Sequence, residues 1–291
     1  MQHMRRSLSY IFGGLLLVSS ACSRKTDDKN LLLVSIEPQR KVLEQIVGDQ
    51  YRVEALLANG SDPETFDPSA ADRMKLDRAV LYFGTGVLPF EEKLQQASKD
   101  KYVNACEGMQ LLYGTHAHHN HKSDTHDNDH LQEADPHYWS SIKNMRIMAA
   151  NMRDAVERID TAGTMERILR YNAYVKHLDS LDNSIGQRLK HVQNASFAVW
   201  HPSLSYFARD YSLRQLSLGM EGKDLSAKGL RKAIDDALAD SVRVFFFQKE
   251  YDSRQAEAIN DAIGSRFVII DPLTYDWEEQ LNIIADEIAR P

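Results

Sequence analysis

The feature of this sequence that most constrains the fold is one long stripe of apolar residues near the middle of the chain. Between residues 164 and 193 they recur at spacings of three and four, namely at Ile168, Tyr171, Val175, Leu178, Leu181, Ile185, Leu189 and Val192. This periodicity predicts an amphipathic helix about 40 Å long, more than twice the average helix length. Such a helix is suited to join two lobes rigidly. A surface helix of a single domain and a coiled-coil segment are the alternatives, and the stripe is short for a coiled coil.

Short apolar runs alternate with longer helical patterns on both sides of this stripe. Before it, the pattern predicts strands at 31–36, 53–58, 79–83 and 102–105, and helices at 39–47, 69–76, 89–97 and 141–159. After it, the pattern predicts strands at 196–200, 215–218, 242–247 and 267–270, and helices at 203–211, 226–239, 253–263 and 276–289. This order is typical of βαβ units.

We therefore predict an α/β protein of two lobes, each a mostly parallel sheet flanked by helices, joined by one long rigid helix. The N-terminal lobe would span residues 31–160, the linking helix residues 161–194, and the C-terminal lobe residues 195–291.

The N-terminal segment indicates export. Arg5 and Arg6 precede an apolar run, residues 11–18, that is too short to span a bilayer. Residues 1–21 are therefore predicted to be a signal peptide. Cys22 directly follows Ala21 and resembles a bacterial lipoprotein processing site, in which the cysteine becomes the lipidated first residue of the mature protein. We expect residues 22–30 to tether the protein to a bacterial membrane on its extracytoplasmic side; an ordinary signal peptide with a chance cysteine is the alternative.

Composition excludes several function classes. The chain has 35 Lys plus Arg and 42 Asp plus Glu, and this acidic balance argues against a nucleic-acid binder. Two cysteines are too few for a disulfide scaffold. The GxSxG, HExxH, Walker A and GxGxxG motifs are all missing, so we expect no enzyme.

Histidine is unevenly distributed. The chain has 11 histidines, and six of them lie in an almost apolar-free segment, residues 115–135, namely His116, His118, His119, His121, His126 and His130. A segment without apolar residues cannot build a core, so we predict a mobile insert. Neutral imidazoles ligate transition metals. The insert either collects or senses metal beside the functional site, or it is a solvated loop that binds metal only incidentally.

Four further residues are candidate metal ligands. His201 and Asp271 each follow a predicted strand, at the sheet edge where ligands of parallel sheets bind. His137 lies in the segment DPHYW, and Glu64 lies in the turn-rich segment GSDPETFDPS. Each alone has an ordinary structural explanation. Together, two imidazoles and two carboxylates form a closed ligand set for Zn²⁺ or Mn²⁺, with two ligands from each lobe.

These segments carry a family resemblance. GSDPETFDPSAADRMKLDRAVLYFGTG, DPHYW, HPSLSYFARDYSL and IGSRFVIIDPLTYDW occur in an order that resembles the metal-specific solute-binding lipoproteins of bacterial ABC transporters, of the zinc and manganese (ZnuA/TroA) type. The resemblance covers residues 31–290, with the long helix and a His-rich insert typical of the zinc members. It implies metal ligands at Glu64, His137, His201 and Asp271.

One departure concerns the first ligand. The family usually has histidine after the proline, and this chain reads Asp62-Pro63-Glu64. Either Glu64 ligates the metal, or it points away and three ligands with a water hold the ion.

The resemblance implies an extracytoplasmic binding protein that captures a divalent metal between its lobes and delivers it, as a monomer, to a membrane permease with a cytoplasmic ATPase. We expect zinc, because of the Irving–Williams order and the His-rich insert; Mn²⁺ or Fe²⁺ is the alternative, since oxygen ligands favour them. A surface adhesin or metal sensor with a structural metal is a second alternative. A zinc hydrolase would need an open coordination position and a catalytic base, for which no motif is present.

Overall fold

The computed structural model describes residues 31–57, 60–114, 134–219, 225–249, 251 and 254–291. The predicted signal peptide, Cys22 and the tether lie outside the described residues, and so do the six histidines of the insert. None of the helices within the described ranges is long and apolar enough to cross a membrane.

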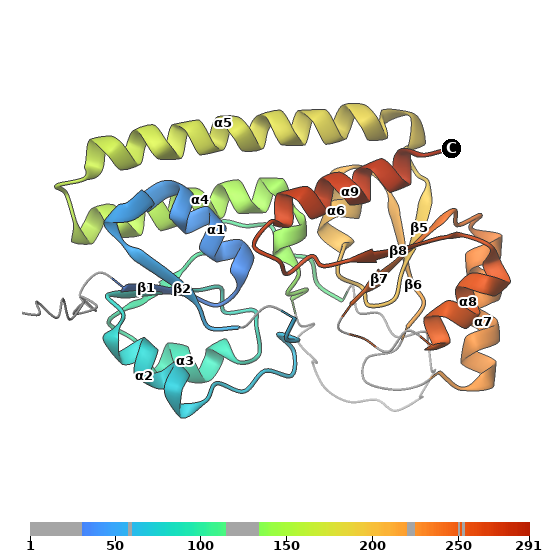
Figure 1. The fold of residues 1–291 in the computed structure, drawn as a ribbon, viewed down its shortest axis with the longest axis horizontal. Coiled ribbons are helices and arrows are strands. Elements are labelled where there is room, and N and C mark those ends of the chain that lie inside the picture. Colours follow the sequence, from blue (N-terminus) through green and yellow to red (C-terminus); the bar gives the residue numbers. More distant parts are fainter. Residues whose placement is uncertain (1–30, 58–59, 115–133, 220–224, 250, 252–253) are drawn as a thin grey trace, which may run out of the picture.

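The first lobe is built on a sheet of four parallel strands in the order β2-β1-β3-β4. Its strands are β1 (Leu31–Val34), β2 (Arg52–Ala55), β3 (Leu81–Gly84) and β4 (Tyr102–Asn104). Its helices are α1 (Glu37–Val47), α2 (Ala70–Arg78), α3 (Glu91–Ala97) and α4 (Ile142–Ile159). Helices α1 and α4 lie on one side of the sheet, and α2 and α3 on the other (Figure 1).

The second lobe repeats this topology, with four parallel strands in the order β6-β5-β7-β8. Its strands are β5 (Ser196–Val199), β6 (Arg214–Ser217), β7 (Val244–Gln248) and β8 (Arg266–Ile270). Its helices are α6 (Ser205–Asp210), α7 (Ala227–Ala239), α8 (Arg254–Ile263) and α9 (Trp277–Ala289). The predicted α/β class and the two parallel sheets are confirmed.

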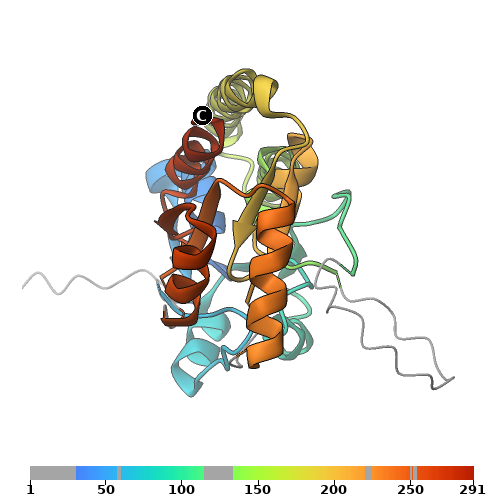
Figure 2. The same cartoon turned by 90° about the vertical axis from the view of Figure 1, so that its right-hand side faces the viewer.

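The long helix α5 (Thr164–Leu189) continues into a short 3-10 turn, Lys190–Val192. It packs against α1 and α4 in the first lobe and against α9 in the second. Figures 1 and 2 show it running above both lobes, with α9 beside it. The predicted helix between the lobes is therefore confirmed.

The buried face of α5 follows the predicted stripe only in its second half, from Leu178 to Leu189. In the first half Arg167 and Tyr174 are buried, whereas Ile168 is exposed. Arg167 can be buried because Glu157 and Asp160, at the end of α4, both form ion pairs with it. Ile168 therefore belongs to the apolar stripe of the sequence but not to the buried face of the helix.

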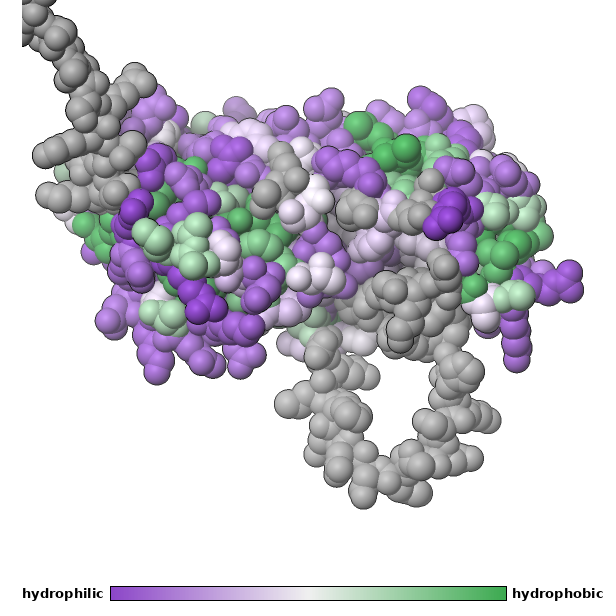
Figure 3. Space-filling view, turned by 60° about the horizontal axis from the view of Figure 1, so that its bottom comes forward, coloured by the Kyte–Doolittle hydropathy of each residue, from purple (hydrophilic) through white to green (hydrophobic). Residues whose placement is uncertain are grey.

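One continuous apolar core extends through both lobes. It includes Leu32 and Val34 of β1, Val199 of β5, and Trp277 and Leu281 of α9. Separating the lobes widely would expose this shared apolar surface to water. The cost in free energy rises roughly in proportion to the area exposed. The exposed large hydrophobic residues, in contrast, are distributed among α2, α4, α5, α7, β8 and the connecting segments. The face drawn in Figure 3 accordingly shows a mostly hydrophilic surface that is interrupted by several separate apolar groups.

Candidate metal centre

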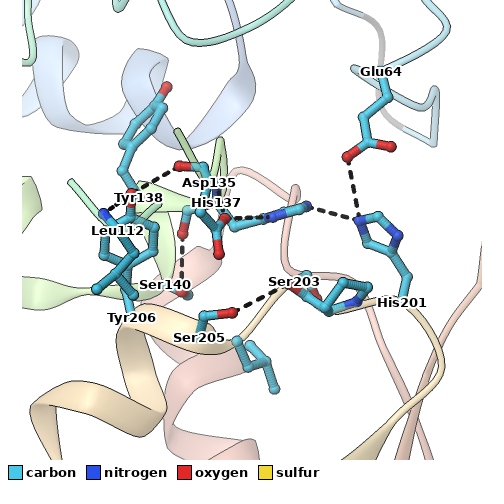
Figure 4. A network of polar contacts seen from close by, with 12 residues as sticks. Glu64, Leu112, Asp135, His137, Tyr138, Ser140, His201, Ser203, Ser205 and Tyr206 are labelled. Atoms are coloured by element: carbon cyan, nitrogen blue, oxygen red, sulfur yellow. Dashed lines mark hydrogen bonds and ion pairs between the residues drawn. The ribbon is translucent and has the colours of Figure 1, made fainter. Parts of the chain in front are cut away.

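Three of the four predicted ligands lie together between the lobes. Glu64, His137 and His201 each offer one ligand atom, and these atoms lie within 4.8 Å of one another. The Nε2 atoms of His137 and His201 are 2.9 Å apart, and Glu64 Oε1 is 3.6 Å from His201 Nε2 (Figure 4). Two of these residues come from the first lobe and one from the second, so the group joins the lobes.

Glu64 is held in the loop between β2 and α2 by the residue two positions before it. The Asp62 carboxylate accepts a hydrogen bond from the Glu64 backbone N–H at 2.9 Å and one from the Thr65 hydroxyl at 3.2 Å. An aspartate that bonds the backbone two residues on forms an Asx turn. Asp62 was not among the predicted site residues, although an aspartate before a proline is a turn signal in the sequence.

His137 directly precedes a 3-10 turn, Tyr138–Ser140, and is oriented by the buried Asp135. Asp135 Oδ1 accepts hydrogen bonds from the backbone N–H and from the ring Nδ1 of His137, both at 2.9 Å. Because a carboxylate can only accept, Nδ1 carries the proton, and the lone pair of Nε2 points toward His201. Carboxylates orient metal-binding histidines in this way in many sites.

Asp135 is itself held in place by Tyr206. The Tyr206 hydroxyl donates to the Asp135 backbone carbonyl at 2.7 Å and accepts from the Leu112 N–H at 3.1 Å (Figure 4). The sequence offered no signal for Tyr206 beyond its closeness to His201, since its partners come from the other lobe.

His201 follows β5 and is fixed through its backbone by Gln248, the last residue of β7. Gln248 accepts from the His201 N–H at 3.3 Å, and its amide donates to the His201 carbonyl at 2.7 Å and to Ser203 Oγ at 2.6 Å. The Tyr251 ring stacks on the His201 ring with centroids 5.4 Å apart. Tyr251 and Trp139 also line the pocket in front of the two histidines.

Asp271, the fourth predicted ligand, is not part of the group of three. Its carboxylate forms an ion pair with Lys249, and its backbone N–H donates to Gln280 Oε1 at 2.9 Å. The next two residues, Pro272 and Leu273, line the same pocket as His137 and His201. Asp271 therefore lies beside the site with its carboxylate bound elsewhere, and its role as a ligand stays a prediction.

The arrangement suits one small cation. The pocket volume is about 10 Å³, enough for a single water-sized occupant. Two nitrogen ligands of a tetrahedral zinc ion lie roughly 3.3 Å apart, given Zn–N bonds near 2.0–2.1 Å. The two histidine nitrogens at 2.9 Å would need to separate only slightly, and an ion would then replace the hydrogen bond between them.

Comparison with known families gives one match over most of the chain. The family described as zinc-uptake complex component A, periplasmic (ZnuA), matches residues 32–287.

Among individual relatives, the chain is 25% identical over 279 residues to the zinc-binding lipoprotein AdcA of Streptococcus pneumoniae, covering 91% of this chain and 54% of AdcA. It thus spans about half the length of that relative. It is 23% identical over 280 residues to the high-affinity zinc uptake system protein ZnuA of Bacillus subtilis, covering 91% of this chain and 87% of that protein.

Two solved structures have a similar fold. A crystal structure of ZnuA superimposes with a TM-score of 0.78 at 30% identity, covering 89% of this chain and 97% of the other. A manganese-bound periplasmic metal-binding protein from Candidatus Liberibacter asiaticus gives a TM-score of 0.73 at 19% identity, covering 89% of this chain and all of the other, which shows the shared fold alone.

Proposed function

The chain belongs to the ZnuA family of periplasmic zinc-uptake components, and from that premise we propose that it captures a divalent metal ion outside the cytoplasm for an ABC importer. The ion binds between the two lobes and passes to a membrane permease that is driven by a cytoplasmic ATPase. The protein acts as a monomer.

The observation that carries the proposal is the convergence of ligand atoms from Glu64, His137 and His201 within 4.8 Å of one another. The two histidines line one small pocket, and Glu64 directly follows its lining residues Asp62 and Pro63. Binding replaces water around the ion by two imidazoles and a carboxylate, and no covalent chemistry is required. Asp135 keeps the His137 nitrogen ready to ligate, which lowers the cost of ordering the site.

Zinc is the proposed cargo. Two imidazole nitrogens suit zinc, and the Irving–Williams order favours it over manganese and iron. Relatives named for zinc binding and for zinc uptake support this choice. The second candidate is Mn²⁺ or Fe²⁺, because Glu64 supplies an oxygen ligand where the family usually has histidine. Competition between Zn²⁺ and Mn²⁺ on protein purified without added metal decides between them.

Calorimetric titration with zinc tests the site. We expect one tight site in the wild type, and a loss of affinity of at least about 100-fold in His201→Ala, since even removing a partner behind a ligand weakens metal binding 10–100-fold. The matched control is His191→Ala, because His191 is exposed in the turn after α5, where its ring is hydrogen-bonded to the Ala289 carbonyl at 3.1 Å. Unchanged affinity and stoichiometry in His201→Ala would show that the ion binds elsewhere.

The His-rich insert is proposed as an auxiliary loop that holds metal weakly beside this site. Deleting residues 116–130 should remove weak binding events from the titration and leave one tight site. Loss of the tight site on deletion would contradict this division of roles.

Membrane attachment is proposed through a lipid on Cys22, after removal of residues 1–21. The export signal in the sequence supports it, as does the description of AdcA as a lipoprotein. Membrane fractionation of a Cys22→Ser variant checks it, since that variant should appear in the soluble fraction.

A further inference from the structure

Lys249 and Asp271 lie side by side because of the strand register. Strands β7 and β8 are parallel neighbours, and their last register pair is Gln248 with Ile270. Lys249 and Asp271 are the next residue of each strand, at the carboxyl edge of the sheet. The Lys249 ammonium forms an ion pair with Asp271 Oδ2, and the Lys249 backbone N–H donates to the Ile270 carbonyl at 3.4 Å.

Both members of the pair adjoin the metal site through their chain neighbours. Gln248, immediately before Lys249, holds the backbone of His201. Pro272, immediately after Asp271, lines the pocket together with His137 and His201. Asp271 is thus one residue away from the lining of the pocket, and Lys249 is one residue away from the glutamine that holds His201.

The two partners differ in exposure. The Lys249 side chain is 45% exposed, whereas that of Asp271 is 19% exposed. An ammonium that leaves the carboxylate thus reaches solvent at once, while the carboxylate stays at the margin of the site. Ion pairs this open contribute little to stability, so the pair is readily exchanged.

We propose that Lys249 is an internal competitor of the metal ion: in the metal-free protein its ammonium holds Asp271, and an entering divalent ion must displace it. This inference rests on the proposed function. The doubly charged ion attracts the carboxylate more strongly than the single charge of the ammonium at similar distance. When the ion leaves, Lys249 takes the carboxylate back, which favours release. Lys249 thereby sets the affinity and the release rate of the site.

The test is a double-mutant cycle with Lys249→Met and Asp271→Asn, and zinc affinity measured by competition with a chromophoric chelator. Stopped-flow transfer to the chelator gives the release rate. We expect Lys249→Met to tighten zinc binding about two- to fivefold, the range that corresponds to losing one exposed ion pair. Asp271→Asn should weaken binding, and in that background Lys249→Met should have almost no effect.

Lys232→Met is the matched control, because Lys232 is 52% exposed and pairs with Asp236 within α7. It should leave zinc affinity unchanged. Thermal melting of the metal-free variants verifies that each is folded.

Two outcomes would overturn the inference about Lys249 and leave the proposed function standing. If Lys249→Met leaves zinc affinity unchanged, the pair only joins the ends of β7 and β8. If the change is equally large with Asn at position 271, the lysine acts by general charge repulsion and not through Asp271. A wild-type protein that binds neither zinc nor manganese overturns the proposed function as well, and this result is distinct from the other two.

Discussion

Asp135 and Asp62 show how single side chains position this site. Each is an aspartate two residues before a candidate ligand, and each accepts a hydrogen bond from that ligand's backbone N–H. Asp135 also binds the His137 ring, so it determines which nitrogen is available to the ion. The same local motif therefore presents a carboxylate, Glu64, and an imidazole, His137, from two loops of one lobe.

Glu91 is a fully buried carboxylate outside the site. Its Oε2 accepts from the Thr85 N–H and hydroxyl, both at 2.8 Å, and from the Gly86 N–H at 2.6 Å, while Oε1 accepts from the Ser35 hydroxyl. Burial raises the pKa of Glu91, and these hydrogen bonds offset part of the rise. Glu91 thus joins the ends of β1 and β3 while burying an ionisable group.

The raised pKa of Glu91 predicts that the stability of the folded protein depends on pH. In the unfolded chain a glutamate ionises near pH 4.3. The folded protein holds the Glu91 proton to higher pH, so it binds more protons than the unfolded chain above that value. Its contribution to the free energy of unfolding is therefore complete below pH ~4.3 and is lost as the pH rises through the folded pKa.

Glu91→Gln should remove this dependence, because the amide does not titrate. Urea unfolding at pH 5 and pH 8 measures it: the loss of stability on raising the pH should be smaller in Glu91→Gln than in the wild type. Glu92→Gln, at an exposed neighbouring position, should behave as the wild type. Equal pH dependence in wild type and Glu91→Gln would contradict the assignment.

At the scale of elements, three helices begin with a serine cap within the part of the chain that the structure describes. Ser69, Ser141 and Ser226 accept hydrogen bonds from the backbone N–H three residues later, at the starts of α2, α4 and α7. Ser141 differs from the others because its hydroxyl donates to a carboxylate of the other lobe, that of Asp210 at the end of α6. It therefore joins an N-terminal-lobe helix to a C-terminal-lobe helix.

Ser141→Ala should consequently lower the free energy of unfolding by about 2–3 kcal/mol, the sum of a lost cap and a lost hydrogen bond to a charged group. Ser226→Ala removes only a cap and should lower it by about 1 kcal/mol. Urea denaturation of both variants measures the difference. Equal losses would show that the bond between Ser141 and Asp210 contributes nothing.

At the scale of the whole molecule, the lobes are restrained on the side of α5. Besides the shared core, Tyr275 donates to Glu44 of α1 at 2.7 Å, and Lys41 of α1 pairs with Asp276 at 3.0 Å. Glu278 of α9 accepts from Tyr174 of α5 at 2.8 Å. These contacts cross from the first lobe and the linking helix to the second lobe, so we expect modest rocking rather than wide hinge closure.

Distances between spin labels measure this motion. With both native cysteines replaced by serine, labels at the exposed positions Arg73 of α2 and Lys228 of α7 report on the two lobes. Zinc binding should change their separation by no more than about 2 Å, as in binding proteins that are already organised. A change several times larger would contradict the restraint by α5 and the shared core.

Sequence alone determined the types and order of the elements, the two parallel sheets and the long helix between them. Periodicity and capping are local properties, so they can be read without knowing the fold. Boundaries shifted by a few residues; α3, for example, begins at Glu91 and not at Pro89. The candidates Glu64, His137 and His201 were also found from sequence, because they lie in turn-rich segments or at strand ends.

Only the tertiary structure decided how these residues are partnered. The ion pair of Asp271 with Lys249 depends on the register of β7 and β8, and the support of Asp135 by Tyr206 depends on how the lobes meet. Arg167, and not Ile168, lies in the buried face of α5, because two carboxylates at the end of α4 form ion pairs with it. Such contacts depend on how separate elements pack against one another, and no local pattern encodes the distances on which hydrogen bonds and ion pairs depend.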